Sequence, residues 1–269
     1  MLLLIMKPII FTDLDGTFLN HDDYCFSDSL KGLNKILNEN IPIIFTTSKT
    51  KIEVESLHQK LKLNEPFIIE NGAALFIPKN YKELDFSFLE EYENYFIYQL
   101  GLSYDEILEF YNKYKEEFGL LGFSDMNKWE LMKYTKLDSQ IASLSKQRNF
   151  TEPFILHDES KLKSLKILAS KYGIKITKGG RFYHLIGINQ DKGKAVEDTI
   201  KIFEKVFNEK IKSVALGDGE NDIPMLENVD VPIIIKNHKG GYINCKIKNI
   251  QKSTYKGSAG WSEMVLKNV

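Results

Sequence analysis

Cysteine and long apolar runs are scarce in this sequence, which argues against a disulfide-stabilised protein and against a membrane protein. The two cysteines, Cys25 and Cys245, are far apart in the chain and form no metal-ligand pair. A structural disulfide is therefore not expected, which fits a reducing compartment. The apolar opening, residues 1–6, is too short for the apolar segment of a signal peptide or for a membrane span. We expect a cytoplasmic protein without a membrane partner.

Arginine is also scarce, because only two of the 36 basic residues, Arg148 and Arg181, are arginines. The 37 acidic residues bring the formal net charge to -1, so the chain offers no basic field for nucleic acid. We expect no nucleic-acid partner. Since lysine covers the surface, an arginine is expected where planar, bidentate hydrogen bonding is needed.

Strand and helix patterns alternate at both ends of the chain. The first third has β-branched runs at 8–13 and 41–47, helical patterns at 27–40 and 48–63, and a strand–turn–strand pattern at 66–78. The last third has helical patterns at 191–207 and 223–229 and apolar runs at 212–218 and 231–237. This alternation predicts an α/β fold in which both ends of the chain build one doubly wound, Rossmann-like parallel sheet.

The middle of the chain differs from both ends in composition, because it is rich in aromatic residues and lysine. Helical patterns at 104–119 and 159–173 are followed by two short strands around a Lys-Gly-Gly turn within 174–187. These patterns predict an α+β module inserted into the core, and a length of 269 residues leaves room for both. The boundaries we expect are 1–80 plus 188–269 for the core and 81–187 for the insert.

Four polar patches fall at predicted strand or helix ends. They are Asp13 with Asp15, Thr46-Thr47-Ser48, Lys192, and the run Gly-Asp-Gly-Glu-Asn-Asp at 217–222. In a doubly wound sheet, ligands bind at the carboxyl ends of the strands. Each patch alone has an ordinary structural explanation. An aspartate can cap a helix, the threonines can open a capping box, and a lysine can be a solvated surface residue.

Taken together, the four patches favour a site for phosphoryl transfer. Up to four carboxylates would meet there, from Asp13, Asp15, Asp218 and Asp222, and such a cluster stays ionised only beside a cation. Oxygen ligands favour Mg²⁺, and a lysine with hydroxyl groups supplies donors for phosphate oxygens. The sequence contains no EF-hand loop, P-loop or Rossmann glycine fingerprint that would offer a competing explanation.

The same residues carry a resemblance to a known family. Asp-Leu-Asp-Gly-Thr at 13–17, a strand-end threonine, a lysine opening a later helix and the run at 217–222 resemble the four motifs of the haloacid dehalogenase superfamily of phosphatases. The order and spacing match across the whole chain. The insert, between the second and third motifs, resembles the large α/β cap of the sugar-phosphate phosphatases in that superfamily, where it sets substrate specificity.

The resemblance implies a role for each matching residue. Asp13 would be the nucleophile that forms an aspartyl phosphate, and Asp15 would protonate the leaving oxygen and later activate water. Mg²⁺ would be held by the Asp13 side chain, the Asp15 backbone carbonyl and Asp218. Asp222 would steady the metal's waters or Lys192.

The phosphoryl oxygens would be bound by Lys192 and by a strand-end threonine. Thr47 is preferred to Thr46 because of its spacing to the following Ser48-Lys49. The other residues expected to bind phosphate or substrate are Ser48 and Asn221.

Three stretches narrow the resemblance to the mannosyl-3-phosphoglycerate phosphatase family, at 46–55, 66–78 and 179–196. Generic relatives carry Thr-Gly-Arg where this chain has Thr-Ser-Lys at 47–49. The substrate of that family is a small phosphorylated sugar glycerate, with a phosphate, a carboxylate and a hexose.

Further candidates for substrate contact each have a structural alternative. Arg181 follows a Gly-Gly turn and its planar fork fits a carboxylate or phosphate, but it could also cap the hairpin at the surface. His184 would point away from Arg181 in a regular strand, so core packing is an equal alternative. Glu70-Asn71-Gly72 would bind sugar hydroxyls or form a turn.

Other functions remain open at this stage. The substrate could be another sugar or glycosyl phosphate, such as glucosyl-3-phosphoglycerate, sucrose phosphate or a hexose phosphate. A phosphomutase shares the two aspartates, but the insert here lies after the second motif. In a phospho-ligand sensor without turnover, loss of Asp13, Asp15, Lys192 or Asp218 would be expected, and all four are present. Either a monomer or a homodimer fits the sequence.

Overall fold

A computed structural model of the chain describes residues 7–179 and 182–269. The chain forms two compact units. The first consists of residues up to Thr47, Asn64–Tyr98 and Asp191–Val269, and the second of Ser48–Leu63 and Gln99–Gln190. Among the described residues, no helix has the length and apolar character that crossing a bilayer requires.

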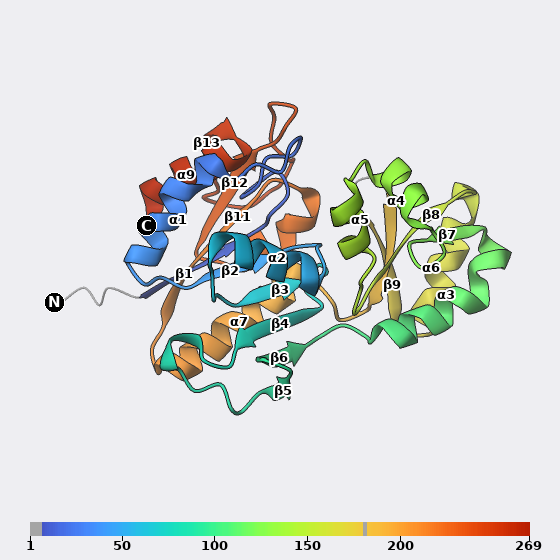
Figure 1. Ribbon diagram of the computed structural model, residues 1–269, viewed down its shortest axis with the longest axis horizontal. Helices are drawn as coiled ribbons and strands as arrows, with labels where there is room; N and C mark the ends of the chain where they lie inside the picture. The colour runs from blue at the N-terminus through green and yellow to red at the C-terminus, as the bar shows by residue number, and fades with distance from the viewer. Residues whose placement is uncertain (1–6, 180–181) are drawn as a thin grey trace. The chain divides into compact units, whose positions relative to one another are not determined.

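The first unit is built on a nine-stranded sheet (Figure 1). Its strand order is β13 (Gln251–Lys256), β12 (Val231–Lys236), β11 (Ile211–Gly217), β1 (Lys7–Thr12), β2 (Ile43–Thr46), β3 (Phe67–Ile69), β4 (Ala74–Pro78), β6 (Tyr95–Gln99) and β5 (Glu90–Tyr92). The pairs from β13 to β3 are parallel, whereas β4 runs antiparallel to β3 and β5 antiparallel to β6.

The strand order reverses beside β1, which confirms the predicted doubly wound sheet. From β1 the chain proceeds outward through β2 to β3, and from β11 it proceeds the other way through β12 to β13. Such a reversal is where the loops at the carboxyl ends of neighbouring strands separate and leave room for a ligand.

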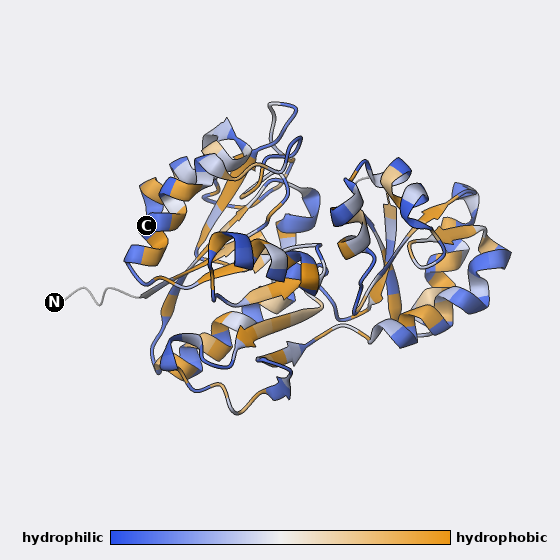
Figure 2. Cartoon of the chain, viewed as in Figure 1, coloured by the Kyte–Doolittle hydropathy of each residue, from blue (hydrophilic) through white to orange (hydrophobic). Residues whose placement is uncertain are grey.

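The helices of the first unit pack in pairs. They are α1 (Leu30–Asn38), α7 (Lys192–Phe207), α8 (Ile223–Glu227) and α9 (Gly257–Asn268), with short 3₁₀ turns at Ser27–Ser29, Tyr81–Glu83 and Glu220–Asp222. Helix α1 contacts α9, and α7 contacts α8. The central strands are apolar along their length, as Figure 2 shows, and Ile9, Ile10 and Phe11 of β1 are fully buried. A strand buried on both faces reads as such a continuous apolar run.

The second unit has an antiparallel sheet with helices on both faces. Its strand order is β7 (Leu120–Gly122), β8 (Glu152–Leu156), β10 (Phe182–Gly187) and β9 (Ile174–Gly179), and its helices are α2 (Lys51–Leu61), α3 (Tyr104–Phe118), α4 (Lys128–Thr135), α5 (Ser139–Ser145) and α6 (Leu162–Ser170), with a 3₁₀ turn at Glu159–Lys161. One core cluster joins Phe154 and Leu185 to α3 and α6, and another joins Ile155 and Phe182 to α4. Alternate residues of each strand therefore serve opposite faces. The expected hairpin within 174–187 is formed by β9 and β10.

The two units differ from the sequence-based boundaries at three segments, of which 188–190 is the shortest and belongs to the second unit. Residues 81–98 belong to the first unit because β5 and β6 extend its sheet beyond β4, where Phe76 packs against Tyr95 at 5.7 Å between ring centroids. Residues 48–63 belong to the second unit, where the Thr50 hydroxyl donates to the Leu144 carbonyl. The assignment of substrate specificity to the insert stays a prediction.

Candidate active site

Three of the polar patches lie at the carboxyl ends of adjacent strands. Asp13 follows β1 directly, Thr47 follows β2, and Asp218 follows β11. Since β11, β1 and β2 are parallel neighbours, these three residues share one edge of the sheet. This is the convergence that the strand-end patches predicted.

The carboxyl end of β1 is held in place by Trp261, a buried residue of α9. Trp261 Nε1 donates to Thr12 Oγ1 at 2.9 Å, and this hydroxyl donates to the Asp13 carbonyl at 2.8 Å. The Trp261 ring also packs edge-on against Phe18, with 4.9 Å between centroids. The backbone on both sides of Asp13 is thereby held by the core.

The loop after Asp13 makes close contact with the end of β11. Gly16 has a φ of +83°, and a Cβ at this position would lie 2.5 Å from Asp218 Oδ2. Only glycine combines this left-handed backbone with so close an approach. Thr17 Oγ1 donates to Asp218 Oδ1 at 3.0 Å, a contact that the sequence analysis did not assign, although Thr17 belongs to the motif that it quoted.

Lys192 lies at the centre of the site, as the first residue of α7. Its Nζ donates to Asp13 Oδ1 and to Asp222 Oδ1, both at 2.7 Å. The side chain is only 1% exposed. The reading of this residue as a solvated surface lysine is therefore wrong, and so is the reading of Asp13 as a plain helix cap.

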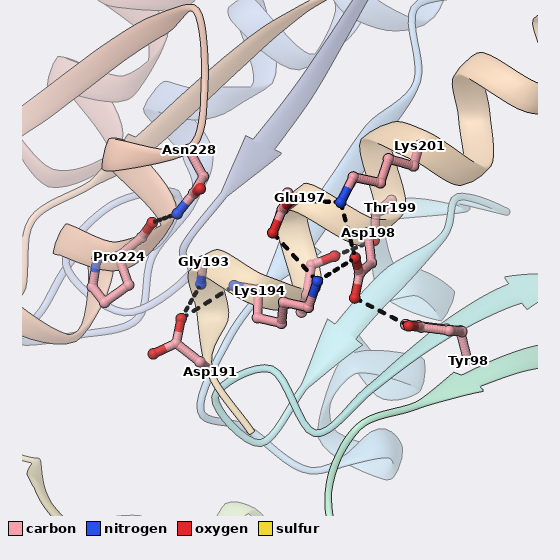
Figure 3. Close-up of polar contacts among 11 residues, drawn as sticks. Tyr98, Asp191, Gly193, Lys194, Glu197, Asp198, Thr199, Lys201, Pro224 and Asn228 are labelled. Atoms are coloured by element: carbon pink, nitrogen blue, oxygen red, sulfur yellow. Dashed lines mark hydrogen bonds and ion pairs between the residues drawn. The ribbon is translucent and has the colours of Figure 1, made fainter. Parts of the chain in front are cut away.

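The N-terminus of α7 is fixed by hydrogen bonds, which Figure 3 shows, and by close packing. Asp191 Oδ1 accepts from the backbone N–H groups of Gly193 and Lys194, so it is the N-cap of the helix. Gly193 packs so closely on α8 that a Cβ would lie 2.4 Å from the Pro224 carbonyl oxygen. That oxygen also accepts from Asn228 Nδ2 at 2.7 Å. These contacts determine where the Lys192 side chain begins.

The carboxylates of the site differ in the acceptor capacity that they have left. Asp222 Oδ1 is bound by Lys192, and its Oδ2 accepts from the backbone N–H groups of Asp218 and Gly219 at 3.1 and 2.9 Å. Asp222 thus fixes both the lysine and the loop that carries Asp218. This geometry is consistent with the supporting role expected for it.

The acidic cluster fits a divalent cation. One carboxylate oxygen from each of Asp13, Asp218 and Asp222 lies within 4.8 Å of the other two. Because the oxygens of Asp222 already have donors, Asp13 and Asp218 are the side chains best able to ligate an ion. All the candidate ligand atoms are hard oxygens, which suit Mg²⁺.

The pKa values of the cluster reflect an excess of negative charge. Burial, with the nearby Asp222 carboxylate, raises the pKa of Asp13, and Lys192 opposes that rise. Burial and Asp222 also raise the pKa of Asp218 to about 7. Burial alone would lower the pKa of Lys192, but Asp13 and Asp222 hold it above its ordinary value. Lys192 therefore faces the carboxylates of Asp13, Asp218 and Asp222, with that of Asp15 nearby, an imbalance that a bound cation would relieve.

The structure distinguishes the two threonines at the end of β2. Thr46 Oγ1 is oriented back along the strand, donating to the Ile44 carbonyl at 3.4 Å, whereas Thr47 lies past the strand end. The capping box of the next helix is formed by Thr50 and Glu53, which leaves Thr47 and Ser48 outside it. These placements support Thr47 as the threonine that would bind phosphate.

The turn after β3 contacts the same edge of the sheet. The Asn71 backbone N–H donates to the Thr47 carbonyl at 2.8 Å, and Asn71 Oδ1 accepts from Asn221 Nδ2 at 3.4 Å. A Cβ on Gly72 would lie 2.2 Å from the Asp191 carbonyl oxygen. The turn thus meets the segments that carry Thr47, Asn221 and Lys192.

The remaining candidates belong to the second unit. His184 is half-buried, its Nδ1 is buried without a hydrogen-bond partner, and burial with the nearby Arg148 lowers its pKa to about 3. Arg181 lies outside the described residues. Arg148 was not among the candidates expected from the sequence; its guanidinium is buried and donates to Thr151 Oγ1 at 3.0 Å and to the Ser48 carbonyl at 3.1 Å. The scarcity of arginine was the one signal for it.

Comparison with known proteins agrees with this geometry. Residues 10–245 match the haloacid dehalogenase-like hydrolase family. The chain belongs to that family. The resemblance to its phosphatases inferred from the four motifs is thereby confirmed, and the chain is an enzyme. The roles of individual residues stay predictions.

Several relatives match this chain over nearly their whole length. The glucosyl-3-phosphoglycerate/mannosyl-3-phosphoglycerate phosphatase of Persephonella marina is 49% identical over 257 residues, covering 96% of this chain and 95% of the relative. The mannosyl-3-phosphoglycerate phosphatase of Pyrococcus furiosus is 33% identical over 249 residues, covering 92% and 99%.

Solved structures share the fold of this chain. A haloacid dehalogenase-like hydrolase from B. subtilis superposes with a TM-score of 0.68 at 17% identity, covering 98% of this chain and 100% of the other. The sucrose-phosphatase from Synechocystis gives 0.61 at 11% identity, covering 98% of each chain. At such low identity these likenesses support the architecture alone.

Proposed function

We propose that this enzyme hydrolyses a phosphate monoester through an aspartyl phosphate on Asp13, with Mg²⁺ as cofactor. The observation that carries the proposal is the position of Lys192 Nζ, 2.7 Å from both Asp13 and Asp222, at the edge where Asp218 also lies. A nucleophilic carboxylate must stay ionised although it is buried, and the lysine contributes to that.

The residues divide the reaction into two displacements. In the first, an Asp13 carboxylate oxygen bonds to phosphorus, the ester P–O bond breaks, and Asp15 gives its proton to the departing alcohol oxygen. In the second, Asp15 takes a proton from water, the water oxygen bonds to phosphorus, and the bond from Asp13 to phosphorus breaks. Lys192 and Thr47 would hold the phosphoryl oxygens in both steps.

The donor set is suited to the metal. Asp13, Asp218 and the Asp15 backbone carbonyl would hold Mg²⁺, and Asp222 would keep Lys192 in place. When bound, the ion offsets charge on the phosphoryl oxygens and on the crowded carboxylates.

The substrate that we propose is a glycosyl-3-phosphoglycerate. The names of the two relatives support this class, as do the stretches at 46–55, 66–78 and 179–196. Mannosyl-3-phosphoglycerate, which gives mannosylglycerate and phosphate, is the first expectation. Glucosyl-3-phosphoglycerate is the second, since it also appears in the name of the Persephonella marina relative.

The test is phosphate release with Mg²⁺ across a panel of esters. The panel contains mannosyl- and glucosyl-3-phosphoglycerate, 3-phosphoglycerate, sucrose phosphate and simple hexose phosphates, with Asp13→Asn as control. Preference for the glycosyl-phosphoglycerates, lost in the variant, supports chemistry and substrate together. Turnover spread evenly over hexose phosphates contradicts the substrate, and no turnover by folded, Mg²⁺-loaded protein contradicts the chemistry.

A further inference from the structure

The turn between β3 and β4 contains the longest run of consecutive left-handed residues in the part of the chain that the structure describes. Glu70, Asn71 and Gly72 have consecutive positive φ values of +47°, +60° and +89°. Glu70 is moreover completely buried, whereas left-handed residues at helix ends, such as Lys62 and Lys136, are at least partly exposed. Backbone strain in so confined a place persists only where surrounding contacts impose it, and it concentrates at functional sites.

The contacts of this turn reach three segments that are far apart in sequence. The Asn71 backbone N–H donates to the Thr47 carbonyl at 2.8 Å. The Asn71 side chain accepts from Asn221, which follows β11. The α-carbon of Gly72 lies against the backbone at the start of α7. A Cβ at this position would be 2.2 Å from the Asp191 carbonyl oxygen and 2.7 Å from the Lys192 backbone nitrogen.

We propose that Asn71 and Gly72 are positioning residues for the active site. The turn acts as a spacer that sets the end of β2, the start of α7 and the loop after β11 at fixed distances from one another. Thr47, Lys192 and Asn221 gain their relative positions from it. Its role in catalysis rests on the function proposed above, whereas its role in phosphate binding does not require turnover.

This role differs from the two alternatives that the sequence left open, a sugar contact and an ordinary turn, which stay predictions. The α-carbon of Gly72 faces protein backbone, and the Asn71 side chain already bonds Asn221. The left-handed conformation of the turn is what brings its backbone against Asp191. A mere connection between β3 and β4 has no need of these contacts.

The experiment compares Gly72→Ala with Gly240→Ala. Both glycines have nearly the same left-handed φ, +89° and +83°, but a Cβ on Gly240 meets nothing within 4 Å. The two variants therefore share the cost of left-handed alanine and differ in the collision with Asp191. The measurements are the melting temperature, kcat and KM for p-nitrophenyl phosphate and mannosyl-3-phosphoglycerate, and the calorimetric Kd of inorganic phosphate with Mg²⁺.

For Gly72→Ala we expect kcat to fall by about tenfold or more, because a displacement of about 1 Å in a reacting group can cost about 100-fold. Phosphate binding should weaken several-fold as Lys192 moves. Gly240→Ala should lose some stability and leave both quantities within about twofold, as expected for an exposed turn. Equal kcat and equal phosphate Kd in the two variants would overturn the proposal.

Two further outcomes keep the test decisive. If wild-type protein binds phosphate but turns over no ester, the proposed function fails, and the phosphate Kd of the two variants still tests the turn. If Gly72→Ala does not fold, Asn71→Ala and Asn249→Ala make the comparison, since both asparagines are left-handed, with φ values of +60° and +58°. A loss of kcat confined to Asn71→Ala supports the proposal, and equal effects overturn it.

Discussion

The two units bury carboxylates in opposite ways. In the first unit, Asp13, Asp218 and Asp222 surround one charged lysine. In the second unit, Glu152 is fully buried, accepts from neutral donors at both carboxylate oxygens and has the positive charge of Arg148 nearby. Its Oε1 accepts from the Ser124 hydroxyl and backbone N–H at 2.6 and 2.8 Å, and its Oε2 from the Tyr104 hydroxyl at 2.6 Å.

The pKa values express the same difference. Burial raises the pKa of both Asp218 and Glu152. A neighbouring acid, Asp222, adds to the rise for Asp218, whereas for Glu152 the hydrogen bonds from Ser124 and Tyr104 oppose it. A buried acid satisfied by neutral donors completes a fold, and a buried acid crowded by other acids requires a ligand. An excess of negative charge therefore distinguishes the acids of the candidate site from a buried acid such as Glu152 that only supports the fold.

The largest effect on kcat is expected when Lys192, the buried lysine bonded to Asp13 and Asp222, is replaced. Lys192→Met should lower kcat by about 100-fold or more, as loss of a preorganised donor to a phosphoryl or oxyanion group does elsewhere. Lys194→Met is the matched control, since that lysine is half-exposed and pairs with Glu197 and Asp198 on the outside of α7 (Figure 3). Steady-state kinetics checks both variants. A similar loss in the control would mean that helix stability, and not the buried ammonium, is responsible.

The next effect concerns the metal. Mg²⁺ should stabilise the wild type by about 2.7 kcal/mol at 100 times its Kd, which follows from binding to the folded state alone. Asp218→Asn should remove most of that gain, because it takes away one of the two carboxylates with acceptor capacity left. Thermal unfolding with EDTA and with Mg²⁺ measures the difference. An unchanged Mg²⁺ shift in the variant would exclude Asp218 as a ligand.

In the second unit a smaller effect is expected, and it concerns stability alone. Glu152→Gln should lower the free energy of unfolding by about 1–2 kcal/mol, since hydrogen bonds to a charged acceptor are replaced by weaker ones. The kcat of folded protein should stay within about twofold, because the hydrogen bonds of Glu152 are made to Tyr104 and Ser124 within the second unit. A double-mutant cycle with Tyr104→Phe measures the coupling energy. A zero coupling would contradict the bond between Tyr104 and Glu152.

The sequence predicted the cluster of Asp13, Asp218 and Asp222 but not the hydrogen-bonded surroundings of Glu152, and the reason is geometric. Parallel strands bring their carboxyl ends to one edge, so residues that follow strands, such as Asp13 and Asp218, must meet. The partners of Glu152 come from a helix and a turn of an α+β unit, for which no such rule exists. The same holds for Arg148, whose contact with Ser48 bridges 100 residues.

Two other features could not be predicted from the local sequence pattern. The segment Glu90–Gln99 carries acidic and aromatic residues without clear alternation, so its place as an edge hairpin of the first sheet was not foreseen. Asn71-Gly72 did signal a turn, but the approach of Gly72 to Asp191 depends on how β3 and α7 pack. Residue type at a turn is local information, whereas close approach is not.

The smallest expected effect is the change in the free energy of unfolding when a buried acid becomes an amide. It tests the comparison most directly, because the change is expected to have opposite signs in the two units. Without metal, Asp218→Asn should stabilise the protein by about 1 kcal/mol at pH 8, since it removes a buried charge beside Asp222 and keeps an oxygen for Thr17. Loss of a satisfied acid, Glu152→Gln, should destabilise it. Chemical unfolding in EDTA measures both.

The pH dependence fixes the cause of that stabilisation. The pKa of Asp218 is raised to about 7 in the folded state from 3.8, so the folded wild type holds a proton that the unfolded chain has lost between these values. The stability contributed by the protonated carboxyl is complete below about pH 4 and is lost as the pH rises through 7. The advantage of Asp218→Asn should therefore grow between pH 4 and 7 and level off above it. A variant advantage that does not change with pH would show that packing, and not repulsion among the acids, distinguishes this cluster from Glu152.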